Sequence, residues 1–479
     1  MAKIVALVFF ARLISVEDMG LYTILLLGFS AASAFMSLGL PSIVTKFIAE
    51  DVVVGKKERA ASVWYEAFVL SDLTSVAIAV IFLFSKFPAG VSHLPNSAEM
   101  SAIGVLFAMD IVASIGTVGG AAILGLCEFK DYAVIYSAYG TVRPWLVVLF
   151  IYAIRSMLGL VEGWLVADSA VAVFQIIYLW RRLGPPVFKF NAKYLLKLSS
   201  PLYVAAIASF LYSTFDQLTL IPLVSLTLIG VYGTVATAFG AFTSLINVLG
   251  SVLLPVFSGV HGAKGTDSFV NSVRVASRYV SFVAIPMAFA LVAAARPALT
   301  LLVGERYAGG AIPLAVLALG SVCTVVAMAL APILIVLNET LLAALASLLP
   351  IPVSVVVALA SIPALGIVGA SIARALSMLL SLLLTWYFVR RKMRVKLDLQ
   401  AIMKSIVASA VMALAMEAMQ SLYYSRFLLP LYLCAGLLVY LLAMRTLRAV
   451  NEADMDLIHK MLGQRLRRVC DLLSWVVAR

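Results

Sequence analysis

Long apolar runs alternate along the chain with short segments rich in charge, proline or glycine. A membrane-spanning helix needs about 20 apolar residues, and breaks at the polar segments divide the chain into fourteen candidate spans. The spans lie near residues 4–14, 21–43, 63–86, 102–125, 133–154, 158–180, 199–222, 227–255, 277–303, 311–336, 340–363, 366–388, 402–421 and 426–446. Barrel strands would alternate apolar and polar residues, whereas runs such as 355–360 (VVVALA) are continuous. The pattern therefore predicts an all-α polytopic membrane protein with a shortened first span.

The composition supports this interpretation. Hydrophobic residues make up 63% of the chain and charged residues 12%, whereas soluble domains carry roughly 25% charged residues. The four cysteines form no CxxC pair, and the three histidines are scattered. We therefore expect no disulfide framework, no metal site and no cofactor.

The distribution of Lys and Arg predicts the orientation of the spans. With the N-terminus placed inside, 27 of the 35 basic residues fall on the cytoplasmic side and five outside, and Arg12, Arg143 and Arg374 lie within spans. This asymmetry is typical of the positive-inside rule. We expect a multi-pass protein of the cytoplasmic membrane with both termini in the cytoplasm. The net charge of +12 then reflects topology and indicates no nucleic-acid partner.

Glycine, tyrosine and proline residues recur at matching positions on either side of a central loop, which indicates an internal repeat. Gly20 and Tyr22 open span two and Pro41 ends it, while Gly230 and Tyr232 open span eight and Pro255 ends it. Two six-helix lobes related by a parallel repeat, followed by two C-terminal helices, are a transporter plan. We expect an N-lobe at 1–182, a cytoplasmic linker at 183–198, a C-lobe at 199–389, two spans within 390–446, and a basic amphipathic tail on the membrane at 447–479. The stretch between spans eight and nine is expected to be a cytoplasmic loop.

Several motifs in order along the chain carry a resemblance to a known family. They are ARLISVEDMGLY at 11–22, GLPSIVTKFIAE at 39–50, GLCEFKDY at 125–132, LIGVY at 228–232, VGERYAGGAIPL at 303–314 and ALGIVGASIA at 364–373. Together they resemble the polysaccharide-export flippases of the multidrug/oligosaccharidyl-lipid/polysaccharide exporter superfamily. The chain departs from that pattern at Arg374, where a small or polar residue is more usual.

The resemblance implies a flippase that moves a polyprenyl-linked oligosaccharide between the leaflets by alternating access. A sugar diphosphate cannot cross about 30 Å of hydrocarbon unaided, because charges and unsatisfied hydroxyls are costly there. The alternatives are a drug or cation antiporter of the same superfamily, or a membrane enzyme acting on lipid-linked sugars. We expect no enzyme, because no large loop carries an acidic pair and no glycine-rich phosphate cradle occurs.

Arginines within spans are candidates for contact with the substrate phosphate. Arg143 lies mid-span with Tyr136 and Tyr139 on the same face, and its guanidinium suits bidentate phosphate binding while the tyrosines suit sugar rings. The alternative is an internal ion pair with a carboxylate. Arg12 is a second cavity candidate or an arginine at the outer interface. Arg374 is expected to line the cavity opposite Arg143.

Carboxylates within spans are candidates for coupling to an H⁺ or Na⁺ counter-ion. Asp72, Asp110 and Asp168 lie near mid-depth, where an ionisable group needs an explanation. Each is an ion-coupling group, the structural partner of Arg143 or an ordinary residue facing water. Asp216 lies near the outer end of span seven and opposes the helix dipole, so we expect it to clamp two helices. Ser15 is expected to cap the N-terminus of span two.

Overall fold

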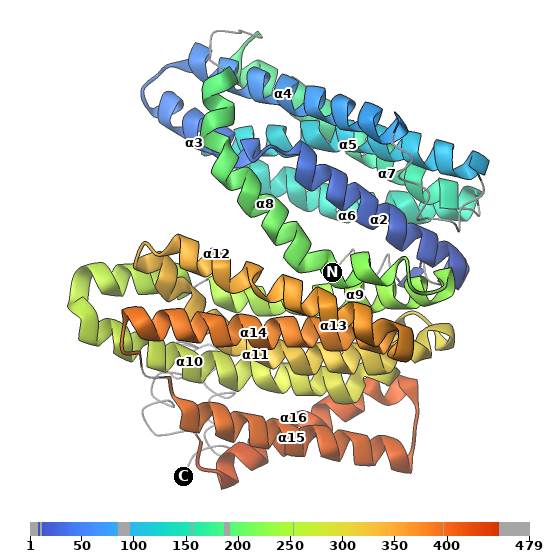
Figure 1. Cartoon of the computed structure of the whole chain (residues 1–479), viewed down its shortest axis with the longest axis vertical. Helices are drawn as coiled ribbons and strands as arrows, with labels where there is room; N and C mark the ends of the chain where they lie inside the picture. The colour runs from blue at the N-terminus through green and yellow to red at the C-terminus, as the bar shows by residue number, and fades with distance from the viewer. Residues whose placement is uncertain are drawn as a thin grey trace. The chain divides into compact units, whose positions relative to one another are not determined.

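The computed structural model describes residues 8–9, 12–84, 96–154, 157–185, 192–251, 253–395 and 397–449. Within these residues the chain is helical and contains no strand. The helices are α2 (Val16–Met36), α3 (Leu40–Val53), α4 (Lys57–Phe84), α5 (Asn96–Gly125), α6 (Phe129–Ile154), α7 (Met157–Leu183), α8 (Ala192–Leu220), α9 (Leu226–Ser251), α10 (Leu253–Leu302), α11 (Ala311–Val336), α12 (Thr340–Leu348), α13 (Pro350–Leu365), α14 (Ile367–Lys392), α15 (Leu399–Leu422) and α16 (Leu429–Thr446). Two 3₁₀ turns, η2 (Glu305–Gly310) and η3 (Arg426–Leu428), complete the order (Figure 1).

The helices confirm the predicted fold class. Eleven segments within the described residues are long and apolar enough to cross a membrane, and each coincides with one of the predicted spans. The predicted spans at 63–86 and 102–125 correspond to α4 and α5. The predicted span at 4–14 lies largely outside the described residues.

The chain forms two compact units, residues 1–233 and 234–479. In the first unit, α3, α4, α5 and α7 surround a core that includes Trp64, Phe47 and Ile123. Helix α8 packs against α2 and α3, so it belongs to this unit by its contacts. The five-part division predicted from the sequence repeat stays a prediction, and the tail beyond residue 449 lies outside the described residues.

Local signals fix the start of α2 as predicted. Ser15 has an extended backbone, and its hydroxyl accepts a hydrogen bond from the Asp18 backbone N–H at 3.0 Å. This bond satisfies one of the N–H groups that a helix start leaves without an intrahelical partner. The preceding prediction of an N-cap at Ser15 is confirmed.

Two glycines at equivalent positions of the predicted sequence repeat meet where α2 crosses the start of α9. A Cβ on Gly20 would overlap the carbonyl oxygen of Leu226, and a Cβ on Gly230 would overlap that of Val16. Both positions therefore require glycine for close backbone approach. Beside the crossing, the Tyr232 hydroxyl donates to Asp216 Oδ2 at 2.6 Å, which joins α9 to α8 and confirms the predicted clamp.

The second unit is built on α10, α11 and α14, with α15 and α16 packed against α10. Its apolar clusters include Phe257, Phe269 and Ile333 on one side and Met412 and Tyr432 on the other. One expectation is wrong here. The segment expected as a loop between spans eight and nine is instead the first half of α10, which runs unbroken for 50 residues.

The continuation of α10 has a physical reason. The polar stretch before the apolar span contains no proline between residues 256 and 285, so nothing in its backbone ends the helix. Pro255 does not end the preceding span, because α9 ends at Ser251 and the proline falls in the first turn of α10, where its missing N–H costs nothing. Pro41 likewise lies in the first turn of α3.

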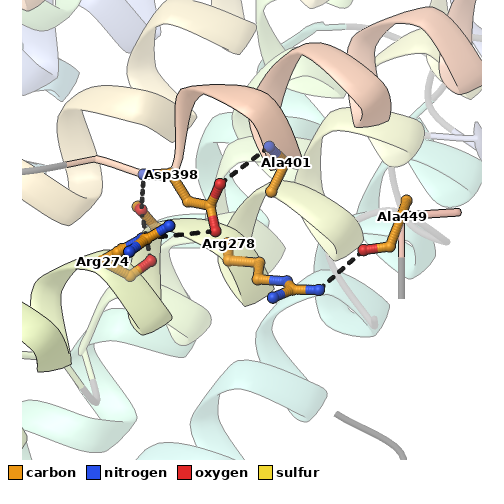
Figure 2. A network of polar contacts seen from close by, with 6 residues as sticks. Arg274, Arg278, Asp398, Ala401 and Ala449 are labelled. Carbon is orange, nitrogen blue, oxygen red and sulfur yellow. Dashed lines mark hydrogen bonds and ion pairs between the residues drawn. The ribbon is translucent and has the colours of Figure 1, made fainter. Parts of the chain in front are cut away.

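Polar contacts at one end of this unit fasten the last two helices to α10 (Figure 2). Arg274 Nε lies 3.8 Å from Asp398 Oδ2, and the other oxygen of Asp398 accepts a bond from the Ala401 backbone N–H at 3.1 Å, capping α15. Arg278 donates to the carbonyl oxygen of Ala449, just beyond α16, at 2.8 Å. These bonds link α10 to both C-terminal helices by side chains that come from α10 itself.

Candidate functional site

A cavity of about 180 Å³ lies inside the first unit, between α2, α5, α6 and α7. Its polar lining comes from Ser33 of α2, Thr117 of α5, Tyr136, Tyr139 and Arg143 of α6, and Asp168 of α7. Phe29 and Val171 are among the apolar residues of the wall. Four of these residues were predicted from the sequence as site residues, so the structure brings much of the expected site together.

Arg143 and Asp168 form an ion pair at the cavity wall. Arg143 Nε lies 3.2 Å from Asp168 Oδ1, and Nη2 donates to Oδ2 at 3.2 Å. The Tyr139 hydroxyl donates to Oδ1 at 2.6 Å. The side chain of Asp168 is 5% exposed and that of Arg143 is 17% exposed. The carboxylate is therefore held by two donors, while the guanidinium keeps an open side toward the cavity.

Aromatic rings enclose the guanidinium. Its central carbon lies 4.8 Å from the ring centroid of Trp164 and 5.5 Å from that of Tyr139, both within cation–π range. Trp164 in turn packs against Tyr22 and Phe29 of α2, with centroid distances of 5.5 Å and 6.2 Å. This packing fixes the plane of the indole, which in turn limits the positions open to the Arg143 side chain.

Helix geometry explains why these four side chains meet. Tyr139 and Arg143 are four residues apart on α6, and Trp164 and Asp168 are four apart on α7, so each pair shares one face. Helices α6 and α7 pack against each other as neighbours along the chain. Pro144 follows Arg143 directly inside α6 and is buried. A proline in a helix interior removes one backbone hydrogen bond of the preceding turn, beside the Tyr139 and Arg143 pair.

A glycine-rich stretch of α5 forms the part of the site that the sequence interpretation missed. The Tyr136 hydroxyl donates to the Gly116 carbonyl oxygen at 3.0 Å. A Cβ on Gly120 would overlap that hydroxyl, and one on Gly119 would lie 2.6 Å from Gln175 Oε1. The signal was present as GTVGG at 116–120, since clustered glycines within a helix often mark close approach.

The predicted ion-coupling carboxylates do not all lie at the cavity. The Ser114 hydroxyl of α5 donates to Asp72 of α4, and Asp72 is not among the lining residues. A second cavity of about 20 Å³ lies beside Ser114 and shares Ser33 and Thr117 with the larger one. The side chain of Asp110 lies outside the described residues.

The two remaining arginines lie elsewhere. Arg12 is exposed, precedes α2 and does not line the cavity. Arg374 lies half-buried on α14 in the second unit, so its place opposite Arg143 stays a prediction. In the part of the chain that the structure describes, no group of three or more His, Cys, Asp or Glu side chains could hold a metal ion.

Comparisons with solved structures identify relatives of the fold. An inward closed structure of the lipid II flippase MurJ shares 14% identity, with a TM-score of 0.76 over 92% of this chain and 95% of that chain. An inward-facing multidrug resistance MATE family transporter of the MOP superfamily shares 16% identity, with a TM-score of 0.70 over 82% of this chain and 93% of that chain. A MATE crystal structure shares 17% identity, with a TM-score of 0.58 over 81% and 92%.

Sequence comparison identifies the family. No curated protein matches the chain at a significant level. The family model described as polysaccharide biosynthesis protein matches residues 9–312, which include residues 9–233 of the first unit and its cavity. This match extends over more than half of the chain and agrees with the resemblance carried by the sequence motifs. The chain belongs to this family of polysaccharide biosynthesis proteins.

Proposed function

We propose that the protein is a flippase that moves a polyprenyl-linked oligosaccharide across the cytoplasmic membrane by alternating access. The observation that carries this proposal is the Arg143 guanidinium at the wall of the cavity, held by Asp168 and flanked by Trp164 and Tyr139. A guanidinium binds a phosphate group with the same two-pronged geometry as a carboxylate. The diphosphate of the substrate can therefore take the place of Asp168 on the same donors.

The size of the cavity indicates which part of the substrate it holds. About 180 Å³ is room for a small charged group and not for a whole oligosaccharide. We place the diphosphate linkage there, with the first sugar against the aromatic rings of Tyr136 and Tyr139. Such a site needs no covalent chemistry, since binding and exposure to alternate sides suffice, and we propose that the protein is not an enzyme.

The fold relatives support this proposal and its nearest alternative to different degrees. The structure with a TM-score of 0.76 is that of a lipid II flippase, and the one with a TM-score of 0.70 is that of a multidrug resistance MATE family transporter. A cation antiporter would use the cavity carboxylate to attract its substrate. Here Asp168 is paired with Arg143, so the described cavity presents no uncompensated carboxylate to a cationic drug, whereas a phosphate can compete with Asp168 for the guanidinium.

We propose that Asp72 and Asp168 couple transport to H⁺ or Na⁺. Asp72 bonds to Ser114, and the small cavity beside Ser114 has room for about one water before the larger cavity begins at Thr117. This arrangement gives a polar route between the two carboxylates. Asp72→Asn should abolish the response of transport to an imposed H⁺ or Na⁺ gradient and leave gradient-independent exchange in place. An unchanged response to both gradients would remove Asp72 from the coupling route.

The test of the flippase proposal is leaflet transfer in reconstituted vesicles containing a fluorescent polyprenyl-diphosphate oligosaccharide. Arg143→Lys keeps the charge but loses the two-pronged donor geometry, so transfer should fall at least tenfold. The matched control is Arg59→Lys, because Arg59 pairs with buried Asp51 at 3.5 Å in the same unit and does not line the cavity. Normal transfer by Arg143→Lys, or no transfer by the native protein, would refute the proposal.

We further propose that both termini are cytoplasmic. In a cysteine-free background, a single cysteine at Asn96 should label only from outside and one at Lys193 only from inside. Labelling of both positions from the same side would contradict this topology.

A further inference from the structure

A second, larger cavity of about 410 Å³ lies in the second unit, where α10 and α15 end and α11 begins. Its lining includes Arg296 of α10, Ile312 of α11, Glu417, Gln420 and Ser421 of α15, and Tyr424 beyond α15. None of these residues takes part in the cavity of the first unit. This cavity is therefore separate from the proposed transport site.

The cavity holds a positive and a negative side chain that do not pair with each other. The guanidinium of Arg296 lies over the Tyr424 ring, 5.1 Å from its centroid. The Glu417 carboxylate is exposed and makes no ion pair or hydrogen bond to any residue that the structure describes. Two opposite charges that line one cavity without meeting within 4 Å leave room for a ligand that carries both charges.

The wall behind the charges is held in place by hydrogen bonds. Gln420 is buried, and its Nε2 donates to the Ala293 carbonyl oxygen at 2.9 Å, which ties α15 to α10 across the cavity. The Tyr424 hydroxyl lies 3.3 Å from Thr300 Oγ1. The spacing of Arg296 and Glu417 is thereby set by the packing of α15 on α10.

The cavity lies close to the ends of two membrane-spanning helices, the level at which we expect lipid headgroups. Arg296 lies six residues before the end of α10 and Glu417 five before the end of α15, so at about 1.5 Å per residue both lie within about 9 Å of the helix ends. Tyrosines such as Tyr424 favour this interfacial level. Ile312, which lines the cavity, is 64% exposed, and Leu414, three residues before Glu417 on α15, is 70% exposed, as residues facing acyl chains would be.

We propose that this cavity binds the headgroup of a zwitterionic phospholipid with a primary amine. The phosphate contacts Arg296 and the ammonium contacts Glu417, while the acyl chains follow the apolar surface past Ile312 and Leu414. Charge-assisted bonds to both ends of the headgroup distinguish this lipid from phosphatidylglycerol, whose headgroup offers Glu417 neutral hydroxyl groups but no ammonium. An inorganic phosphate would use Arg296 alone.

The experiment measures lipid binding to the purified full-length protein by native mass spectrometry, after delipidation and titration with single lipids. The probes are phosphatidylethanolamine, phosphatidylglycerol and inorganic phosphate. The native protein should prefer phosphatidylethanolamine. Glu417→Gln should lower the affinity for it about tenfold and leave phosphatidylglycerol binding unchanged, whereas Arg296→Gln should weaken both lipids by a similar factor.

Matched controls come from η2 at the same end of the unit. Glu305 and Arg306 are exposed and do not line the cavity, so Glu305→Gln and Arg306→Gln should change neither affinity. Arg296 and Glu417 are themselves exposed, so we expect their variants to fold. The thermal midpoint of unfolding without lipid, measured for each variant, checks this.

Three results would overturn the proposal. They are equal affinity of the native protein for both lipids, an unchanged preference in Glu417→Gln, and competition by inorganic phosphate at the concentration at which phosphatidylethanolamine binds. The third result would identify a simple anion site at Arg296.

Discussion

The first unit places an arginine and an aspartate in an ion pair at the wall of a cavity, whereas the second unit surrounds Phe257 and Phe269 with apolar side chains and leaves the charged groups of its cavity, Arg296 and Glu417, exposed. The buried carboxylates of the described residues show the same contrast. They are Asp51, Glu66, Asp168 and Asp216, all in the first unit, while the buried polar residues of the second unit are hydroxyls and one amide.

This contrast indicates that the two units have different roles. A buried carboxylate costs several kcal/mol to desolvate and is retained where its partners compensate it. The second unit avoids that cost, since its buried hydroxyls can bond to carbonyl oxygens of their own helices, as Thr385 does to Ser381 and Ser371 to Ile367. We infer that the first unit recognises the transported substrate and that the interior of the second contributes packing.

The largest expected effect comes from breaking the buried pair of the first unit. Arg143→Ala leaves the Asp168 carboxylate without its charge partner and should lower the free energy of unfolding by about 3–5 kcal/mol, besides abolishing leaflet transfer. The measurement is denaturant unfolding in detergent beside the transfer assay.

A double variant separates the two roles of Arg143. Arg143→Ala combined with Asp168→Asn removes both charges, so stability should return while transfer does not. Recovery of stability and transfer together would mean that Arg143 serves only as a structural partner of Asp168.

Truncation of an apolar side chain in the second unit tests whether this unit contributes packing. Phe257 is fully buried and packs edge-to-face on Phe269 at a centroid distance of 5.7 Å. Phe257→Ala should cost about 3–5 kcal/mol of stability, yet the transfer rate per folded molecule should stay close to native. A loss of transfer in fully folded protein would contradict the inference that the interior of the second unit contributes only packing.

The sequence predicted the elements of the fold better than their ends. Apolar runs located the spans, because hydrocarbon requires continuous helices whatever their neighbours. The first half of α10 was not predicted, because its polar residues suggest a loop although polar residues alone do not end a helix. Only its packing against α11 shows that the helix continues.

The sequence also predicted half of the site. The spacing of Tyr139 and Arg143 placed both on one face of a helix, because that depends on a single helix. Which carboxylate pairs with Arg143 could not be predicted, since Asp72, Asp110 and Asp168 lie at similar depth. The choice of Asp168 depends on how α6 packs on α7, and a single sequence does not reveal that packing.

The glycine crossing of α2 and α9 should show a smaller effect than either buried substitution. A Cβ at position 230 would overlap the Val16 carbonyl oxygen, so Gly230→Ala forces the two helices apart at an expected cost of about 1–3 kcal/mol. The matched control is Gly240→Ala on the same helix, where a Cβ would meet nothing within 4 Å. That control should be neutral or slightly stabilising, because alanine favours helix. Equal effects at both positions would show that the crossing tolerates a side chain.

The smallest effect is expected at the contact between α10 and the start of α15 in the second unit. Arg274 is 55% exposed and lies 3.8 Å from Asp398 Oδ2, so water and salt already screen most of the attraction. Arg274→Gln should therefore lower the free energy of unfolding by about 1 kcal/mol or less, and the difference from the native protein should vanish in 1 M salt. Asp398→Ala should cost more than Arg274→Gln at every salt concentration, because it also removes the N-cap bond to Ala401. A cost above about 3 kcal/mol for Arg274→Gln would mean that the second unit, like the first, depends on a specific ion pair.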